Sequence, residues 1–274
     1  MIKKLTIKEL EKKSDWVWRE TLKIHYGSPE TRVASSLSPI EILVSLYYGG
    51  FVSLYPKNPF SLLRDRIIIS KGHGSLCMYP ILADLGFFSK KELKKVCKSG
   101  SFLGGIPDPI IPGYETINGS LGHGVGVGSG MAFALKNKKS KKNVFVLTGD
   151  GELHEGSNWE AFMFASHHSL NNLIVLVDNN KISMLGHTDS ILSHRNLQKK
   201  MDSFGWKTYE VEDGHNVKDI IKTLNFAVNY NSNKPKMIIF NTNKGNKVPG
   251  LENIPLSHVT AITQENIKLL ISND

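Results

Sequence analysis

The stretch NVFVLTGDGELHEGSNWEAFMFASHHSLNNLIVLVDNNKIS, residues 143–183, decides the fold. It begins with a short run of β-branched and aromatic side chains, residues 143–148, and a second apolar run occupies residues 172–177. Between the two runs, Trp159 and Phe162 recur at helical spacing. A strand, a helix and a strand in this order predict a right-handed crossover in a parallel sheet, so both strands end at the same edge.

Polar groups follow both of these strands directly. Gly149-Asp150-Gly151 follows the first strand, and after 27 further residues Asn179-Asn180 follows the second. Open α/β sheets bind ligands at the carboxyl ends of their strands. A carboxylate and an amide oxygen suit Mg²⁺, which shares its coordination shell with phosphate oxygens. Glycines lack a Cβ and let a phosphate approach the backbone. The pattern predicts half of a magnesium site, which a diphosphate would complete.

Apolar periodicity predicts the other elements. Helices are expected at residues 7–24, 39–48, 75–85, 90–96, 124–135, 157–168, 197–203, 217–229 and 263–271. Strands are expected at residues 67–70, 143–148, 172–177, 208–211 and 236–241. Helices that alternate with apolar strands predict an α/β fold, a doubly wound parallel sheet with helices on both faces.

For several segments and histidines, the sequence alone is compatible with more than one role. The glycine-rich segment 122–130 contains no G-x-G-x-x-G register, so it predicts a helix whose start packs closely on a ligand or another helix. The proline- and glycine-rich loop 103–116 is expected to line a site. Four histidines could be either structural or functional, and they are His123, His154, His187 and His215.

Composition agrees with one domain in the reducing cytoplasm. The chain has 274 residues, 40% of them hydrophobic, and no apolar run long enough for a membrane span or a secretory signal. Its two cysteines, Cys77 and Cys97, indicate reduced thiols. The net charge of +9 includes a lysine cluster at residues 136–142, which is typical of a solvated loop, and no nucleic-acid-binding module accompanies it. A positive field would favour anionic substrates.

The spacing of GDG and NN is similar to the thiamine diphosphate signature. Over about residues 10–272 the chain resembles the amino-terminal, diphosphate-binding domain of the transketolase family. Besides the first stretch, the segments that carry the resemblance are Ser70-Lys71-Gly72-His73-Gly74, residues 119–124, Phe204-Gly205-Trp206 and the Lys244-Gly245 loop before His258. The resemblance implies the thiamine diphosphate-binding fold, with thiamine diphosphate and Mg²⁺, or Ca²⁺ or Mn²⁺, as cofactors.

The resemblance also implies a role for each matched residue. The implied metal ligands are Asp150, Asn180 and the backbone carbonyl of Ile182. The implied contacts to the cofactor are His73, Gly119, Leu121, Asp150, Gly151, Asn180 and His258. The implied catalytic residues are His73, His258 and Glu155, of which the glutamate links paired active sites.

Two positions depart from the pattern of the family. Arg32 stands where a substrate-facing histidine is expected, and Ile106 replaces another histidine in a Gly-His-Pro segment. An arginine offers a planar fork for a carboxylate or a phosphate, and an isoleucine favours an apolar or deoxygenated part of a substrate. We therefore assign Arg32 and Ile106 to the substrate site and expect a modified or deoxy sugar.

The family also uses a glutamate from a separate pyrimidine-binding domain, for which this sequence has no matching segment. Residues 1–274 are therefore expected to form a single diphosphate-binding domain of a two-chain, α₂β₂ enzyme. With a carboxyl-terminal transketolase-like subunit, it would transfer a two-carbon ketol unit between sugars or sugar phosphates. The alternatives are one half of a 2-oxo acid dehydrogenase or decarboxylase, and a noncatalytic regulatory subunit. The presence of Asp150, Asn180 and Glu155 argues against the regulatory alternative.

Overall fold

The predicted sheet is present in the computed structural model, which describes residues 3–260 and 262–272. Residues 1–2, 261 and 273–274 of the expected domain lie outside the described part. All strand pairs are parallel, in the order β1-β2-β3-β5-β4. The strands are β1 (Arg66–Ile69), β2 (Val144–Gly149), β3 (Leu173–Asn179), β4 (Lys207–Val211) and β5 (Lys236–Asn241).

Strands β2 and β3 form the centre of the sheet. Gly149 pairs with Asp178, so the two strands end side by side and leave Asp150 and Asn180 at one edge. Neighbouring side chains face opposite layers, with Phe145 in one core cluster and Val146 in the other. Because both faces are buried, the apolar sequence pattern of these strands is continuous rather than alternating.

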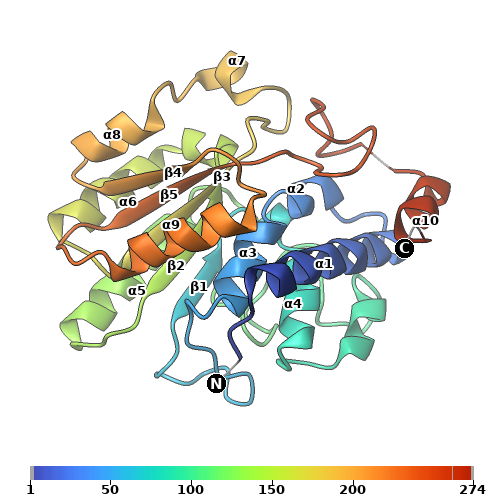
Figure 1. The fold of residues 1–274 in the computed structure, drawn as a ribbon, viewed down its shortest axis with the longest axis horizontal. Helices are drawn as coiled ribbons and strands as arrows, with labels where there is room; N and C mark the ends of the chain where they lie inside the picture. The colour runs from blue at the N-terminus through green and yellow to red at the C-terminus, as the bar shows by residue number, and fades with distance from the viewer. Residues whose placement is uncertain (1–2, 261, 273–274) are drawn as a thin grey trace.

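Helices cover both faces of the sheet (Figure 1). One layer contains α1 (Ile7–Gly27), α3 (Ile40–Tyr48), α4 (Met78–Asp84) and α9 (Val217–Asn229). The opposite layer contains α5 (Gly124–Asn137), α6 (Gly156–His167) and α8 (Leu197–Ser203). The remaining elements are α2 (Val33–Leu37), α7 (Thr188–Leu192), α10 (Gln264–Ser272) and the 3₁₀ helices η1 (Gly72–Gly74), η2 (Lys90–Lys95) and η3 (Gly151–His154).

The doubly wound parallel sheet is confirmed, and the predicted elements at 197–203, 217–229 and 236–241 have the observed bounds. The helix predicted at 90–96 is the 3₁₀ helix η2. Helices α2 and α7 are not predicted, because five residues are too few to display a helical period. Within the described ranges, no helix has both the length and the apolar character that a membrane crossing requires.

The glycine-rich segment begins helix α5. A Cβ at Gly124 would clash with Ser70 at the end of β1, and a Cβ at Gly128 would press on Val146 of β2. Gly126 instead faces open space. Gly124 and Gly128 therefore make close approaches to the sheet. A Cβ at Gly122, just before α5, would lie 2.5 Å from Glu155 Cβ at the start of α6, so the expected close approach to another helix is also present.

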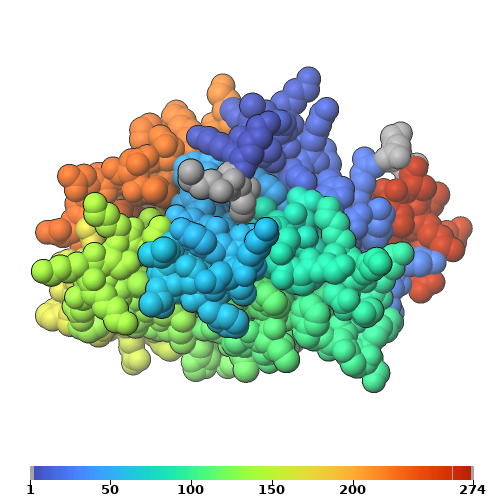
Figure 2. All heavy atoms as spheres, turned by 90° about the horizontal axis from the view of Figure 1, so that it is seen from below, coloured from blue at the N-terminus to red at the C-terminus, as the bar shows by residue number. Residues whose placement is uncertain are grey.

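The segment 50–65 joins α3 to β1 and lies on the underside of the molecule. Figure 2 shows it in light blue, between the lime end of α5 and the teal residues that include α4. Its side chains Phe60, Leu62 and Leu63 are exposed. The segment precedes β1, so it lies at the amino edge of the sheet, opposite the ends of β2 and β3.

Candidate functional site

A cavity of about 300 Å³ lies where β1, β2, β3 and β5 end. Its wall includes the following residues that the sequence predicts for the cofactor or the metal: His73, Gly119, Leu121, Asp150, Gly151, Asn180, Ile182 and His258. It also includes Lys71, Glu152 and Lys244, for which no role is predicted from the sequence. All the predicted cofactor and metal positions thus lie in one cavity at this edge of the sheet.

Asp150 is a buried carboxylate at the end of β2. Only 1% of the residue is exposed, and its Oδ2 accepts a hydrogen bond from Thr188 Oγ1 at 3.0 Å. Burial, and then the nearby charge of Asp178, raise the pKa of Asp150. Both causes penalise the negative charge of the free carboxylate. A bound cation would relieve this penalty.

Asn180 and Ile182 lie in the turn that follows β3. The side chain of Asn180 bends back, and its Oδ1 accepts the backbone N–H of Ile182 at 3.2 Å. The carbonyl of Ile182 in turn accepts a hydrogen bond from Lys244 Nζ at 3.1 Å. Each of these two oxygens has a second lone pair, so both can still face an ion.

A buried ion pair lies directly behind the cavity. Lys71 Nζ donates to Asp178 Oδ2, and the hydroxyls of Ser38 and Thr242 also donate to this carboxylate. Burial raises the pKa of Asp178, but the charge of Lys71 and these hydrogen bonds outweigh it and hold the pKa below its usual value. Asp178 therefore stays ionised and binds one of the two lysines of the cavity.

Two histidines, His73 and His258, lie side by side in the wall of the cavity. The rings of His73 and His258 are 5.3 Å apart and nearly perpendicular. Ser35 Oγ lies 2.8 Å from Nδ1 of His258 and fixes the orientation of this ring. Burial and the charges of Lys244, His73 and Arg32 lower the pKa of His258 to about 4, and burial and Arg32 also lower that of His73. Both rings are therefore neutral at pH 7.

Glu152 is a site residue that the sequence analysis missed. It is buried on the cavity wall, where its carboxylate accepts a hydrogen bond from Ser70 and the backbone N–H groups of Gly122 (3.0 Å) and Gly149 (3.3 Å). Burial raises its pKa. The predicted catalytic residue Glu155, by contrast, is exposed at the start of α6 and does not line the cavity.

The two predicted substrate residues lie beside the cavity. Ile106 packs over Gly119, so closely that a Cβ at the glycine would be 3.3 Å from Ile106 Cδ1. Arg32 precedes α2, and its charge lowers the pKa of both His73 and His258. No residue of the loop 103–116 is part of the cavity wall; the loop reaches the site only through the contact of Ile106 with Gly119.

The segment 183–196, which includes α7, is attached to the Asp150 turn at three points. Besides the Thr188 hydroxyl, His194 Nε2 lies 2.8 Å from the carbonyl oxygen of Asp150, and His154 Nε2 lies 2.8 Å from that of Leu192. The sequence offered no signal for these contacts, since they join residues 38 or 44 positions apart.

The residues of the cavity fit a diphosphate that is held through a divalent cation. Asp150 and Asn180 supply hard oxygen ligands, and Lys244 supplies positive charge, whereas the charge of Lys71 is compensated by Asp178. Burial lowers the pKa of Lys244 to about 8, so a bound anion would stabilise its charged form. Among the described residues, no group of three or more His, Cys, Asp or Glu side chains could hold a metal alone. A cation held by Asp150, Asn180 and the Ile182 carbonyl would complete its coordination shell with oxygens of the diphosphate or of water, as Mg²⁺ commonly does.

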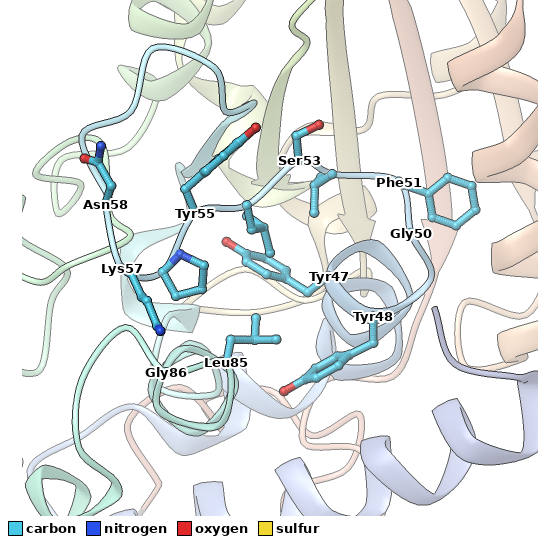
Figure 3. Close-up of a pocket in the computed structure, with 13 residues that line it drawn as sticks. Tyr47, Tyr48, Gly50, Phe51, Ser53, Tyr55, Lys57, Asn58, Leu85 and Gly86 are labelled. Carbon is cyan, nitrogen blue, oxygen red and sulfur yellow. The ribbon is translucent and has the colours of Figure 1, made fainter. Parts of the chain in front are cut away.

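A second, larger cavity of about 700 Å³ lies under the segment 50–65. Its wall includes Tyr47 and Tyr48 of α3 and Leu85 at the end of α4 (Figure 3). It contains none of the residues that the sequence predicts for chemistry. We therefore place the functional site in the smaller cavity.

The depressed pKa of His258 predicts an acid-sensitive fold. The unfolded chain takes up this proton near pH 6.5, whereas the folded chain does so only near pH 4. The free energy of unfolding should therefore fall as the pH drops from about 6.5 towards 4. Denaturant titrations at pH 7 and pH 5 should show a smaller fall for His258→Gln. The exposed His167→Gln is the control, and an equal fall in all three proteins would contradict the assignment.

Comparison with protein families identifies the domain. The model of "Transketolase, thiamine diphosphate binding domain" matches residues 28–273. An apulose-4-phosphate transketolase subunit from Actinobacillus succinogenes is 37% identical over 97% of this chain and 96% of its own length. The subunit of the same name from Phocaeicola vulgatus is 33% identical over 95% of this chain and 92% of its own length. A 6-deoxy-6-sulfo-D-fructose transketolase subunit of a Clostridium species is 35% identical over 88% of this chain and 86% of its own length.

Solved structures agree with this result. Transketolase from Campylobacter jejuni superimposes with a TM-score of 0.89 at 27% identity, covering 98% of this chain and 44% of that chain. A transketolase mutant from Pichia stipitis superimposes with a TM-score of 0.86 at 26% identity, covering 95% of this chain and 40% of that chain. The chain thus spans less than half the length of these two solved transketolases. From the family match and the likeness to relatives of similar length, we conclude that this chain belongs to the transketolase family, as a thiamine diphosphate-binding domain.

Proposed function

We propose that this chain is the amino-terminal subunit of a two-chain transketolase, which transfers a two-carbon ketol unit between a ketose and an aldose. The observation that carries the proposal is the cavity at the sheet edge. It combines Asp150 and Asn180, at adjacent strand ends, with the paired rings of His73 and His258. Thiamine diphosphate would supply the stabilised carbanion that this transfer requires.

The roles of the chain's own residues follow from their positions. Asp150, Asn180 and the Ile182 carbonyl would hold Mg²⁺, and Gly151 would lie against the diphosphate. Lys244 adds positive charge next to the Ile182 carbonyl. The backbone at Gly119 and Leu121 would contact the cofactor on the side where Ile106 packs.

His73 and His258 would act on the substrate as neutral imidazoles. Their pKa values lie below the ordinary value, so each ring offers both a donor and an acceptor nitrogen at pH 7. A neutral ring can donate a hydrogen bond to a carbonyl or hydroxyl oxygen and can exchange a proton with it. The contact between Ser35 Oγ and Nδ1 leaves the Nε2 atom of His258 for this purpose.

The substrate is proposed to be a modified sugar that carries an anionic group. Relatives of similar length are called transketolase subunits for apulose-4-phosphate and for 6-deoxy-6-sulfo-D-fructose. Arg32 would bind the anionic group through its planar fork, and Ile106 would face a part of the sugar without a hydroxyl. Product analysis would test this function. Transfer of two carbons to an aldose supports it, whereas release of CO₂ from a 2-oxo acid would favour the decarboxylase alternative.

The substitution Ile106→His should shift the enzyme towards fully hydroxylated sugars. Ile106 is 39% exposed beside Gly119, so a bound sugar would meet it at the edge of the cavity. A hydroxyl that the sugar buries against this apolar side chain lacks a partner, at a cost of about 1–3 kcal/mol, and a histidine would remove this cost. We expect the ratio of kcat/KM for a hydroxylated sugar over its deoxy analogue to rise correspondingly. The control is Ile110→His, because Ile110 lies in the same loop and is 68% exposed. An unchanged ratio in Ile106→His would reduce Ile106 to a packing role.

A second polypeptide is proposed to complete the site. The relatives described as transketolase subunits have nearly the length of this chain, whereas the solved transketolases are more than twice as long. The partner would supply the pyrimidine-binding domain and its catalytic glutamate. In the α₂β₂ assembly that we propose, the exposed Glu155 would lie near the twofold axis and link two active sites.

A further inference from the structure

His215, which the sequence left unassigned, lies in the turn 213–216 between β4 and α9. This turn packs directly against the loop 242–246 that follows β5. The N–H of Gly214 donates to the carbonyl of Asn241 at 2.7 Å, and a Cβ on Gly214 would approach Thr242 Cγ2 to 2.6 Å. The turn and the loop therefore form one closely packed unit at the edge of the sheet where the cofactor cavity opens.

The contacts of His215 define which of its nitrogens carries the proton. The backbone N–H of Asn243 donates to His215 Nε2 at 2.9 Å, so Nε2 must present a lone pair. Nδ1 lies 2.9 Å from Oε2 of Glu41 and 3.0 Å from the side-chain amide of Asn246. The carboxylate can only accept, so Nδ1 carries the hydrogen, and the Asn246 amide must then present its oxygen to the ring. Glu41 is buried on α3 and holds this tautomer in place. The ring thus connects α3 to the backbone of the loop.

The loop that His215 holds reaches the cofactor cavity. Lys244 follows Asn243 directly, lines the cavity, and donates to the carbonyls of Ile182 and Ser183 at 3.1 Å each. Thr242 precedes Asn243, and its hydroxyl donates to Asp178. The Asn243 N–H, whose hydrogen bond His215 accepts, therefore lies between Thr242 and Lys244, the two loop residues that contact polar groups of the site.

We propose that His215 is a positioning residue of the cofactor site: its Nε2 lone pair holds the backbone of Asn243 and so places Lys244 against the Ile182 carbonyl. The proposal rests on the proposed function in one respect, because Ile182 is the expected metal ligand. The link runs from Glu41 through His215 and Asn243 to Lys244. His215 itself is absent from the cavity wall, so it would act through Lys244.

Two substitutions of His215 test the hydrogen bonds of its two ring nitrogens separately. In His215→Gln, the amide oxygen can occupy the place of Nε2 and accept the Asn243 N–H. In His215→Asn, the shorter amide can donate from the place of Nδ1 to Glu41, but no acceptor reaches Asn243. Both variants replace the ring with an uncharged amide. A loss of packing affects both, whereas only His215→Asn loses the acceptor.

The first measurement is hydrogen exchange of the Asn243 amide in the full chain without cofactor. Exchange should be roughly fivefold faster or more in His215→Asn, the equivalent of one hydrogen bond, and near the wild-type rate in His215→Gln. The second is calorimetric binding of thiamine diphosphate with Mg²⁺. The affinity of His215→Asn for thiamine diphosphate should be about tenfold lower than that of the wild type, which is the lower end of the effect of groups that orient metal ligands. The affinity of His215→Gln should be close to that of the wild type.

The outcomes separate this proposal from the proposed function. Unchanged exchange at Asn243 in His215→Asn would overturn the positioning role, as would equal losses of affinity in the two variants. If the wild-type chain binds no thiamine diphosphate, the proposed function fails, while the exchange result still decides whether His215 holds the loop. Thermal unfolding of each variant shows that the compared proteins are folded.

Discussion

Replacing Asp150 by alanine should lower the affinity for thiamine diphosphate in the presence of Mg²⁺ by about 10–100-fold or more. The lower bound comes from the losses seen when groups that merely orient metal ligands are removed. Asp150 would be the only carboxylate among the proposed metal ligands, so the variant should bind Mg²⁺ less tightly. The negative charge of the diphosphate is then less well compensated. Calorimetric titration with and without Mg²⁺ measures the effect, and the metal dependence itself should weaken.

A loss of folding cannot explain this result, because the fold should tolerate the change. Burial and the charge of Asp178 raise the pKa of Asp150, so removing the carboxylate removes a repulsion in the chain without cofactor. We expect a thermal midpoint equal to or above that of the wild type, partly offset by the lost bond to Thr188. Asp202→Ala, an exposed substitution on α8, is the matched control. Unchanged cofactor affinity in Asp150→Ala would remove the central assignment.

The fold is predictable from this sequence because its central strands are short, apolar and separated by helices with a clear period. Val144 to Thr148 and Leu173 to Val177 need burial on both faces, and only a sheet covered by two helix layers provides it. The short helices α2 and α7 escape prediction because tertiary contacts, rather than a repeated pattern, define them. Thr188 in α7, for example, bonds to Asp150, which lies 38 positions away.

The candidate site is predictable only where its residues share a short motif or a family pattern. Asp150 and Asn180 follow strands directly, so the topology alone brings them together. Glu152 lies in the same motif, but nothing in the sequence indicates that it would turn inward to Ser70. The pair of Lys71 and Asp178 joins residues 107 positions apart, and a local pattern cannot reveal such a pair.

The isolated chain should show no ketol transfer, and activity should appear when the partner is added. The chain offers a cavity for the diphosphate end of the cofactor, whereas the pyrimidine-binding domain that we propose lies on the partner. Exposed apolar side chains next to the cavity, Met184 at 52% and Leu185 at 70%, are suited to contact with another protein. Stable obligate interfaces typically bury on the order of 2,000 Å² or more.

Ketol transfer is measured with this chain at fixed concentration and the partner at rising ratio. Activity should saturate near one partner per chain, and sedimentation should give the mass of two copies of each in the α₂β₂ assembly. The cofactor affinity should rise over the same range of ratios, because the partner closes the open end of the site and holds the rest of the cofactor. Full activity from the isolated chain would contradict the two-chain proposal. If activity does not respond to the partner although cofactor binding does, the chain would instead be a regulatory subunit.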